Sequence, residues 1–161
     1  MSHSITQPKL NEKEIASIIK RAFGEKALIT THEELKGGFF NTAYRIGIDE
    51  DKEYILKVAP SPETKVLRFE ENIIETEVLV MELMSSQGIP VPKVHFFDQS
   101  REILPCEYFI MEIIEGVSMQ ELRPKLTEAE HKRIDREIGT YARKINEIKG
   151  GRFGHIHKHS K

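Results

Sequence analysis

The sequence predicts an α+β fold: an antiparallel sheet that receives a helix after its third strand and is followed by a helical part. Three observations predict it. Apolar, β-branched runs separated by glycine-rich or charged turns fill residues 27–59. Segments 66–87 and 127–149 carry apolar residues at helical spacing. Between these two segments, apolar runs with strand character begin at residues 93 and 107.

Composition indicates an ordinary globular protein. The 161 residues are 39% hydrophobic and 31% charged. A net charge of −2 gives no electrostatic reason to expect nucleic acid or an acidic membrane as partner. No apolar run reaches the roughly 20 residues that span a bilayer, so we expect a cytoplasmic protein. The one cysteine, Cys106, cannot form an internal disulfide and is expected to be buried.

The first helix is predicted over residues 10–24, within an N-terminal segment that we place at 1–27. Asn11 stands at its N-cap, and Glu14 completes a capping box. Gly24 provides a stop signal. One apolar stripe runs along it, formed by Ile15, Ile18, Ile19 and Ala22.

Three strands follow, predicted over residues 27–35, 40–48 and 53–59. Their order, with short turns between them, is that of an antiparallel meander. The first turn contains Gly37 and Gly38, which either form a plain hairpin or allow backbone N–H groups to approach an anion. The second turn is acidic, and we expect it to be solvated.

Capping and glycine residues mark the bounds of two further helices and a strand. The helix at 66–87 is closed by Gly88, and the apolar strand at 107–116 ends at a glycine. Thr127 caps the last helix, Glu130 completes its capping box, and Gly150-Gly151 stops it. That helix has a broad apolar stripe, so we expect either a homodimer through residues 127–149 or poor solubility. The stripe is formed by Ile134, Ile138, Tyr141, Ala142, Ile145 and Ile148.

Two charges stand in apolar patterns. Lys57 lies in the middle of the strand YILKVA, where loss of hydration costs several kcal/mol unless a partner compensates it. Glu77 lies within the apolar stripe of the helix at 66–87, whereas Glu75 heads a more polar stripe. We expect the Lys57 ammonium within ~4 Å of the Glu77 carboxylate. The alternative is that both side chains reach water along their stems.

The order of glycine turn, lysine strand and glutamate helix resembles the nucleotide-binding N-terminal lobe of protein kinases. The details are more similar to the aminoglycoside phosphotransferase family of small-molecule kinases. The stretches GGFFNTAYRI, ETEVLVMELMSSQGIPVPKV, YFIMEIIEGVSMQEL and YARKINEIKGGRFGH carry this resemblance in the family's order, over roughly residues 28–156. It implies a kinase-like lobe at 28–115, then a hinge and the first helices of a truncated C-terminal lobe at 116–161.

The resemblance also implies roles. Family members use MgATP to phosphorylate a hydroxyl of a small molecule such as an aminoglycoside, choline, homoserine or fructosamine. Lys57 would contact the α- and β-phosphates and Glu77 would orient it. The other implied ATP-binding residues are Gly37, Gly38 and Asn41 in the loop over the phosphates, Met111 behind the pocket, and Glu112 and Ile114 at the hinge.

The family's catalytic elements are missing from these 161 residues. The H-x-D-x-x-x-x-N loop and the later metal-binding Asp do not occur, so we expect no catalytic and no metal-binding residue, weak ATP binding, and no activity of the chain alone. The chain thus resembles the first half of a phosphotransferase. Two alternatives stay open: a non-catalytic, oligomerising interaction module that reuses the lobe, and an unrelated α+β domain whose charges are structural.

Overall fold

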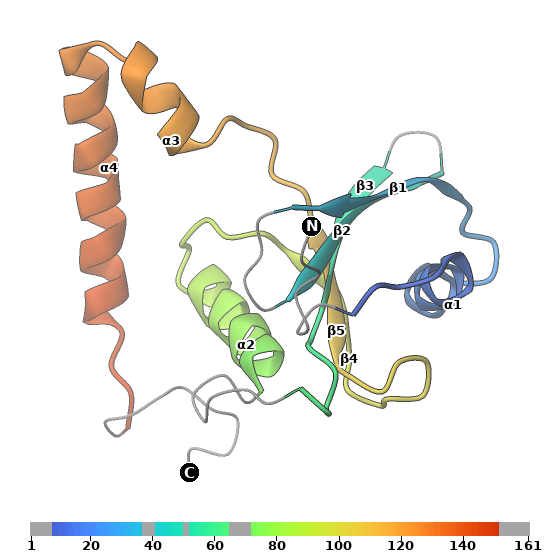
Figure 1. The fold of residues 1–161 in the computed structure, drawn as a ribbon. Helices are drawn as coiled ribbons and strands as arrows, with labels where there is room; N and C mark the ends of the chain where they lie inside the picture. Colours follow the sequence, from blue (N-terminus) through green and yellow to red (C-terminus); the bar gives the residue numbers. More distant parts are fainter. Residues whose placement is uncertain (1–7, 37–40, 50–51, 65–71, 152–161) are drawn as a thin grey trace.

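A five-stranded antiparallel sheet with a helix on each face forms the body of the protein (Figure 1). The computed structural model describes residues 8–36, 41–49, 52–64 and 72–151. The α+β architecture predicted from the sequence is confirmed. In chain order the elements are α1 (Glu12–Phe23), β1 (Ile29–Leu35), β2 (Thr42–Ile48), β3 (Lys52–Val58), α2 (Ile73–Ser86), β4 (Val94–Asp98), β5 (Tyr108–Glu112), α3 (Met119–Leu122), η1 (Arg123–Lys125) and α4 (Glu128–Glu147).

The strand order is β1-β2-β3-β5-β4. The first three strands form the predicted meander, with Ala43 of β2 opposite Lys57 of β3. The chain then passes through α2 and β4 before β5 returns beside β3, with Phe109 opposite Lys57. The strand that carries Lys57 is therefore central, with a neighbour on each side.

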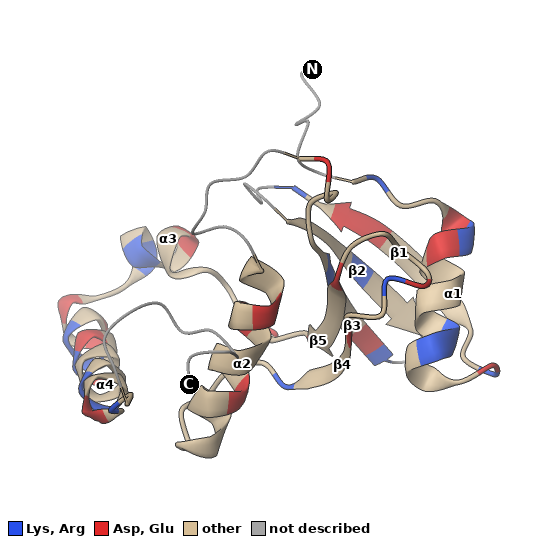
Figure 2. Cartoon of the chain, turned by 90° about the horizontal axis from the view of Figure 1, so that it is seen from below, with Lys and Arg blue, Asp and Glu red and all other residues tan. Residues whose placement is uncertain are grey.

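The two faces of the sheet are covered by different helices (Figures 1 and 2). Helix α1, with the predicted capping box between Asn11 and Glu14, buries its apolar stripe against one face. Leu56 and Val58 of β3 point into this core. On the other face, α2 packs its buried residues Ile74 and Val78 against Phe109. Alternation along β3 puts Lys57 on the α2 side.

Two element boundaries differ from the prediction. Helix α2 begins at Ile73 rather than residue 66, because Asn72 adopts a left-handed conformation with φ 57° that a continuous helix cannot contain. Asparagine tolerates this region better than most residues. Residues 65–71 lie outside the described part of the chain. Strand β5 ends at Glu112, short of Gly116, because its pairing with β3 and β4 ends there.

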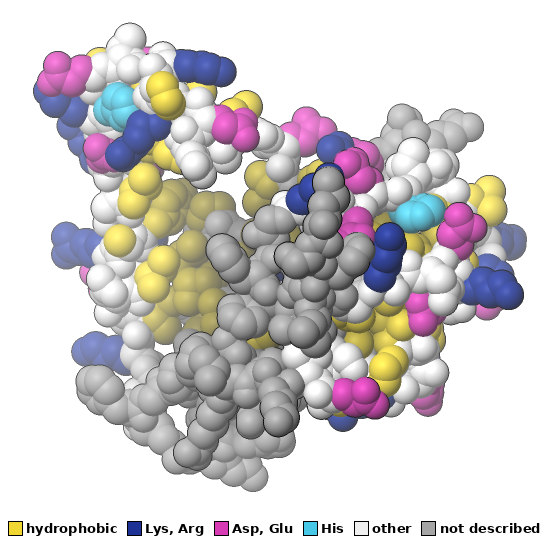
Figure 3. Space-filling view, viewed as in Figure 1, with side chains coloured by type: hydrophobic (Ala, Val, Ile, Leu, Met, Phe, Trp, Pro, Cys, Tyr) yellow, Lys and Arg dark blue, Asp and Glu magenta, His cyan; other side chains and the backbone are white. Residues whose placement is uncertain are grey.

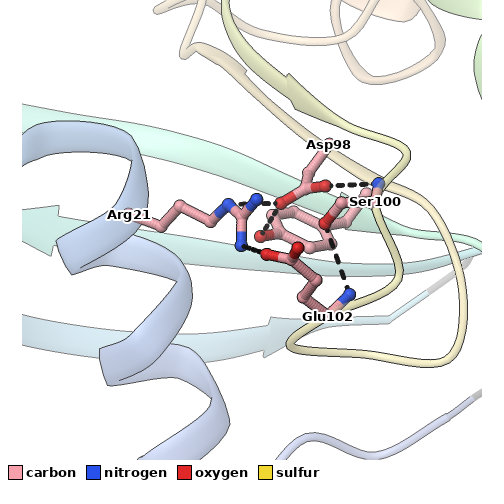
Figure 4. A network of polar contacts seen from close by, with 5 residues as sticks. Arg21, Asp98, Ser100 and Glu102 are labelled. Atoms are coloured by element: carbon pink, nitrogen blue, oxygen red, sulfur yellow. Dashed lines mark hydrogen bonds and ion pairs between the residues drawn. The ribbon is translucent and has the colours of Figure 1, made fainter.

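A polar network fastens α1 to the far edge of the sheet (Figure 4). The Asp98 carboxylate, 5% exposed, accepts hydrogen bonds from the Ser100 N–H at 2.7 Å and the Tyr108 hydroxyl at 2.8 Å. Arg21 of α1 places its Nε 2.8 Å from the same carboxylate and donates to Glu102 at 2.6 Å. Three groups thus donate to the carboxylate of a buried acid, which compensates its lost hydration.

The C-terminal part stands away from the sheet. Helix α4 begins with the predicted capping box between Thr127 and Glu130, and none of its residues is buried. Apolar side chains gather along the side of α4 that faces α2, where the molecule is hollowed (Figure 3). Ile138 and Ile145 are 56% and 43% exposed. Among the described residues, no helix is both long and apolar enough to cross a membrane.

Candidate nucleotide site

The two charges that stand in apolar patterns meet. Lys57 Nζ lies 2.5 Å from Glu77 Oε1, which joins the central strand β3 to helix α2. The side chains are 22% and 26% exposed, so each has lost most of its hydration. The predicted ion pair is confirmed, and with it the register of α2 that places Glu77 toward the sheet.

An aromatic ring of the neighbouring strand β5 lies against the lysine ammonium. The Lys57 ammonium lies 5.8 Å from the centroid of the Phe109 ring, within the range of a cation–π contact. Phe109 is fully buried between the sheet and α2. Met111, two residues along β5, packs on the edge of the same cluster. The stem and charge of Lys57 are therefore held by packing as well as by Glu77.

Two buried side-chain oxygens at the N-terminal end of β2 have no hydrogen-bond partner. Asn41 Oδ1 and Thr42 Oγ1 are both buried without a hydrogen bond, and such atoms are uncommon in folded proteins. Asn41 stands two residues before Ala43, which is the cross-strand neighbour of Lys57. By strand alternation Asn41 shares the face of Ala43 and Lys57, whereas Thr42, opposite Val58, lies on the face that α1 covers. Gly37 and Gly38, in the turn that precedes them, lie outside the described residues.

The hinge residues lie at the other end of β5. Glu112 donates its backbone N–H to the Lys93 carbonyl, and its carboxylate accepts the Lys93 N–H, both at 2.9 Å. The Lys93 N–H thus donates to the Glu112 side chain, beside the end of the strand pairing. Ile114 follows the strand and is 63% exposed. At 3.3 Å per residue, Glu112 is about 10 Å from Phe109 along the strand.

The structure brings Lys57 and Glu77 together. Along the strands Asn41 lies on one side of Lys57, beyond Val58, and Met111 lies on the other, opposite Ile55; Glu112 and Ile114 follow Met111. No group of three or more His, Cys, Asp or Glu that could hold a metal occurs in the described ranges. A cavity of about 120 Å³ lies elsewhere, at the start of α2, and Lys57 does not line it.

Sequence reasoning missed two residues, one beside Lys57 and one in the network that attaches α1 to the sheet. Phe109 was seen only as part of an apolar strand, and its position under Lys57 depends on the pairing of β5 with β3. The buried Asp98 was also missed, although an acid at the end of the apolar run VHFFD was a usable signal. Both depend on contacts between segments far apart in the chain.

The chain belongs to the phosphotransferase enzyme family, whose family model matches residues 31–160. A solved structure of a proposed aminoglycoside phosphotransferase from Ralstonia eutropha JMP134 is similar, with a TM-score of 0.50 and 16% identity, over 68% of this chain and 29% of that one. This likeness shows that the fold is that of part of a phosphotransferase.

Two further structures resemble the chain less closely in fold. They are proposed fructosamine-3-kinases from Haemophilus somnus 129PT, at TM-score 0.46 and 20% identity, and from Thermobifida fusca YX-ER1, at 0.49 and 16%. They are matched over 66% and 67% of this chain and 32% and 33% of their own lengths. The chain thus spans about a third of these structures. No curated protein matches it.

Proposed function

We propose that this chain is the nucleotide-binding part of an ATP-dependent phosphotransferase that phosphorylates a hydroxyl of a small molecule. The observation that carries the proposal is the ion pair between Lys57 and Glu77. A half-buried pair of this kind adds little net stability, because the loss of hydration offsets the attraction. A lysine held on the central strand of a phosphotransferase fold is better explained by an anionic ligand.

In this proposal Lys57 supplies a fixed positive charge to the α- and β-phosphates of ATP. Glu77 and the Phe109 ring restrict the ammonium to one position, so little ordering is needed when the phosphates arrive. Asn41, whose buried Oδ1 has no hydrogen bond, would lie at the phosphate end, where its amide NH2 group could donate to a phosphate oxygen. The loop of Gly37 and Gly38 would cover the phosphates with backbone N–H groups.

The adenine would bind at the hinge through backbone atoms. The Glu112 carbonyl would accept from an adenine amino group, and the Ile114 N–H would donate to the ring. Met111 would close the back of this pocket. A separation of about 10 Å between Glu112 and Phe109 leaves space for the nucleoside between hinge and lysine.

No group of three or more His, Cys, Asp or Glu lies together in the described ranges, and we assign no residue of this chain to magnesium. The sequence also lacks the H-x-D-x-x-x-x-N loop. We therefore propose that the chain alone binds ATP weakly and does not transfer phosphate. An aminoglycoside-like molecule, choline or a similar alcohol is the proposed acceptor class of a complete enzyme, and a cytoplasmic location, with its ATP supply, is part of the proposal.

A titration of ¹⁵N-labelled chain with ATP, followed by NMR, tests the nucleotide role. We expect amide shifts at Lys57, at Phe109 and after Glu112, and loss of these shifts in Lys57→Ala. Lys52→Ala is the matched control, because Lys52 is on the same strand and exposed. The absence of any shift at millimolar ATP would contradict the proposal for this chain.

A second candidate function is an oligomerising interaction module without nucleotide binding. The exposed apolar side of α4, including Ile138 and Ile145, is the observation that favours it. The same titration separates the two candidates, because an interaction module predicts self-association with no response to ATP. Self-association through residues 127–149 is compatible with both.

A further inference from the structure

We propose that the Glu112 carboxylate is a positioning residue of the nucleotide site. It fixes the end of β5 against Lys93 and so sets the direction in which residues 113–114 leave the sheet. This inference rests on the proposed nucleotide role of the hinge and deepens it. The hinge contacts proposed above use backbone atoms, so the sequence assigns no role to the side chain at position 112, whereas its contact with Lys93 does.

Two hydrogen bonds join Glu112 to Lys93. The Glu112 N–H donates to the Lys93 carbonyl, and the Lys93 N–H donates to Glu112 Oε1, both at 2.9 Å. The first bond joins two main chains, whereas the second joins a main chain to a carboxylate, and a charged acceptor makes a hydrogen bond stronger. Because the two bonds use separate atoms, they restrict rotation of this residue as well as its displacement from β4.

The side-chain bond lies next to an irregularity in the sheet. Val94 of β4 pairs with Met111, and Phe96 pairs with Ile110, so the register shifts between them, at His95. An extra residue of this kind bends a strand and interrupts its regular pairing. The carboxylate bond continues the connection between β4 and β5 past this irregularity.

The residues before β4 explain why a side chain makes this bond. Pro92 has no N–H to donate, so Lys93 carries the first donor after it, immediately before β4 begins at Val94. The Glu112 carboxylate is the partner of this donor. Truncation of the carboxylate would therefore remove one of the two bonds that join Glu112 to Lys93.

The carboxylate lies on the side of the sheet opposite to Lys57. Glu112 is directly opposite Tyr54, whose ring lies on the α1 side, 4.8 Å from the ring centroid of Phe23. Alternation along β3 places Lys57 on the other face, toward α2. The Glu112 side chain is therefore separated by the sheet from the proposed phosphate site. Any effect of this side chain on nucleotide binding must act through the hinge backbone.

The space around the carboxylate allows it to be changed without disturbing the core. Glu112 lines a pocket of about 330 Å³ together with Tyr54, His95 and Ile113. The His95 ring stands edge-on to the Tyr54 ring, with 5.0 Å between the centroids. Because Glu112 borders a pocket rather than the packed interior, its truncation should leave the apolar core beneath α1 intact.

The chain beyond Glu112 is exposed. Strand β5 ends at this residue and α3 begins at Met119. Between them, Ile114 and Val117 are 63% and 61% exposed. Segments with so little burial are among the least stable parts of a fold. The conformation of residues 113–114 therefore depends on how Glu112 is held.

A hinge in one fixed conformation can select the nucleobase. In the proposed function the Glu112 carbonyl would accept from the amino group of adenine, and the Ile114 N–H would donate to the ring. Inosine has a carbonyl where adenosine has this amino group, so it offers an acceptor in place of a donor. A site rejects such an analogue when its own hydrogen-bonding groups are left unpaired, which requires that they cannot turn to suit it. The Glu112 carboxylate should therefore maintain the preference for adenosine over inosine.

Titrations of the ¹⁵N-labelled chain with adenosine and with inosine, followed by NMR, test this role. In Glu112→Ala we expect adenosine affinity to fall about three- to tenfold, with a smaller change for inosine. Glu112→Gln should keep most of the wild-type preference, because its amide oxygen can still accept the Lys93 N–H. Glu115→Ala is the matched control, since it removes the same charge from an exposed residue of the same pocket. It should leave the preference unchanged.

Amide hydrogen exchange of the free chain gives a second readout that needs no ligand. We expect faster exchange of the Glu112 and Lys93 amides in Glu112→Ala, and exchange close to that of the wild type in Glu112→Gln and Glu115→Ala. Unchanged exchange in Glu112→Ala, or an undiminished preference for adenosine in that variant, would overturn the proposal. If the wild type binds neither nucleoside, the proposed function fails for this chain. The exchange comparison then still decides whether the carboxylate fixes the hinge.

Discussion

Replacing Asp98 by alanine is expected to destabilise the attachment of α1 to the sheet. The substitution removes the acceptor for the Ser100 N–H and for the Tyr108 hydroxyl, and it removes a charge partner of Arg21. Tyr108 is 1% exposed, so its hydroxyl has no access to water in the variant. Arg21 keeps its contact with Glu102.

The size of the effect follows from these contacts. Leaving the Tyr108 hydroxyl buried and unpaired costs about 1–3 kcal/mol. Losing the hydrogen bond from the Ser100 N–H to the charged carboxylate adds about 1–2 kcal/mol, whereas Arg21 is 35% exposed and keeps Glu102. For a chain of this size, 1 kcal/mol lowers Tm by about 2–4 °C. We therefore expect Tm to fall by roughly 10 °C.

Thermal unfolding followed by circular dichroism measures this change. Glu102→Gln is the control, because the Glu102 side chain is 68% exposed and its contact with Arg21 is worth at most about 1 kcal/mol. Asp98→Asn should lie between the two, since an amide oxygen can still accept the Ser100 N–H. If Asp98→Ala lowered Tm no more than Glu102→Gln, the contacts of Asp98 would not stabilise the attachment of α1 to the sheet.

The same carboxylate makes stability depend on acid pH. Burial raises the pKa of Asp98, but the hydrogen bonds from Ser100 and Tyr108 and the charge of Arg21 outweigh it, so the net pKa is lowered. A lowered folded-state pKa stabilises the protein above the unfolded pKa of about 4, and this stabilisation is lost as pH falls through the folded value. The free energy of unfolding of Asp98→Asn should therefore fall less steeply below about pH 4 than that of the wild type.

Three further predictions concern other sites. Gly47→Ala should lower the free energy of unfolding in urea by about 1–3 kcal/mol, because the added Cβ would lie 2.5 Å from Thr31 Oγ1. An unchanged urea midpoint would mean that Thr31 moves aside at no cost. The Cys106 thiol, buried with its pKa raised by burial to about 11, should not react with Ellman's reagent at pH 8 until the protein unfolds, and rapid reaction of the native chain would contradict its burial. The purified chain should show no ATP consumption above background with aminoglycosides, choline or homoserine; turnover that disappears in Lys57→Ala would show that catalytic groups were overlooked.

Much of the fold could be predicted because its signals are local. The capping boxes at Asn11 and Thr127 involve residues three positions apart, and both form as expected. The meander follows from short turns between apolar runs. The pairing of Lys57 with Glu77 could be predicted although the residues come from different elements, because each charge was out of place in its own apolar pattern.

The rest depends on contacts that leave no local pattern. The sequence predicts a start of α2 that is too early, because the segment before Ile73 has a helical composition. No residue type in that segment predicts the left-handed conformation of Asn72. Arg21 belongs to the polar side of α1, where a charge needs no explanation, so its link to Asp98 could not be anticipated. The roles of Gly37 and Gly38 remain predictions, since they lie outside the described residues.

The most direct test of the central claim compares the affinities of the chain for ATP and for adenosine by calorimetry. If Lys57 binds the phosphates, the wild type should bind ATP more tightly than adenosine. Lys57→Ala should reduce ATP affinity about tenfold or more, since a charge-assisted hydrogen bond contributes roughly 1.5–3 kcal/mol, while adenosine affinity and the Lys52→Ala control stay unchanged. Equal affinities of the wild type for the two ligands, or an ATP preference that survives in Lys57→Ala, would contradict the account.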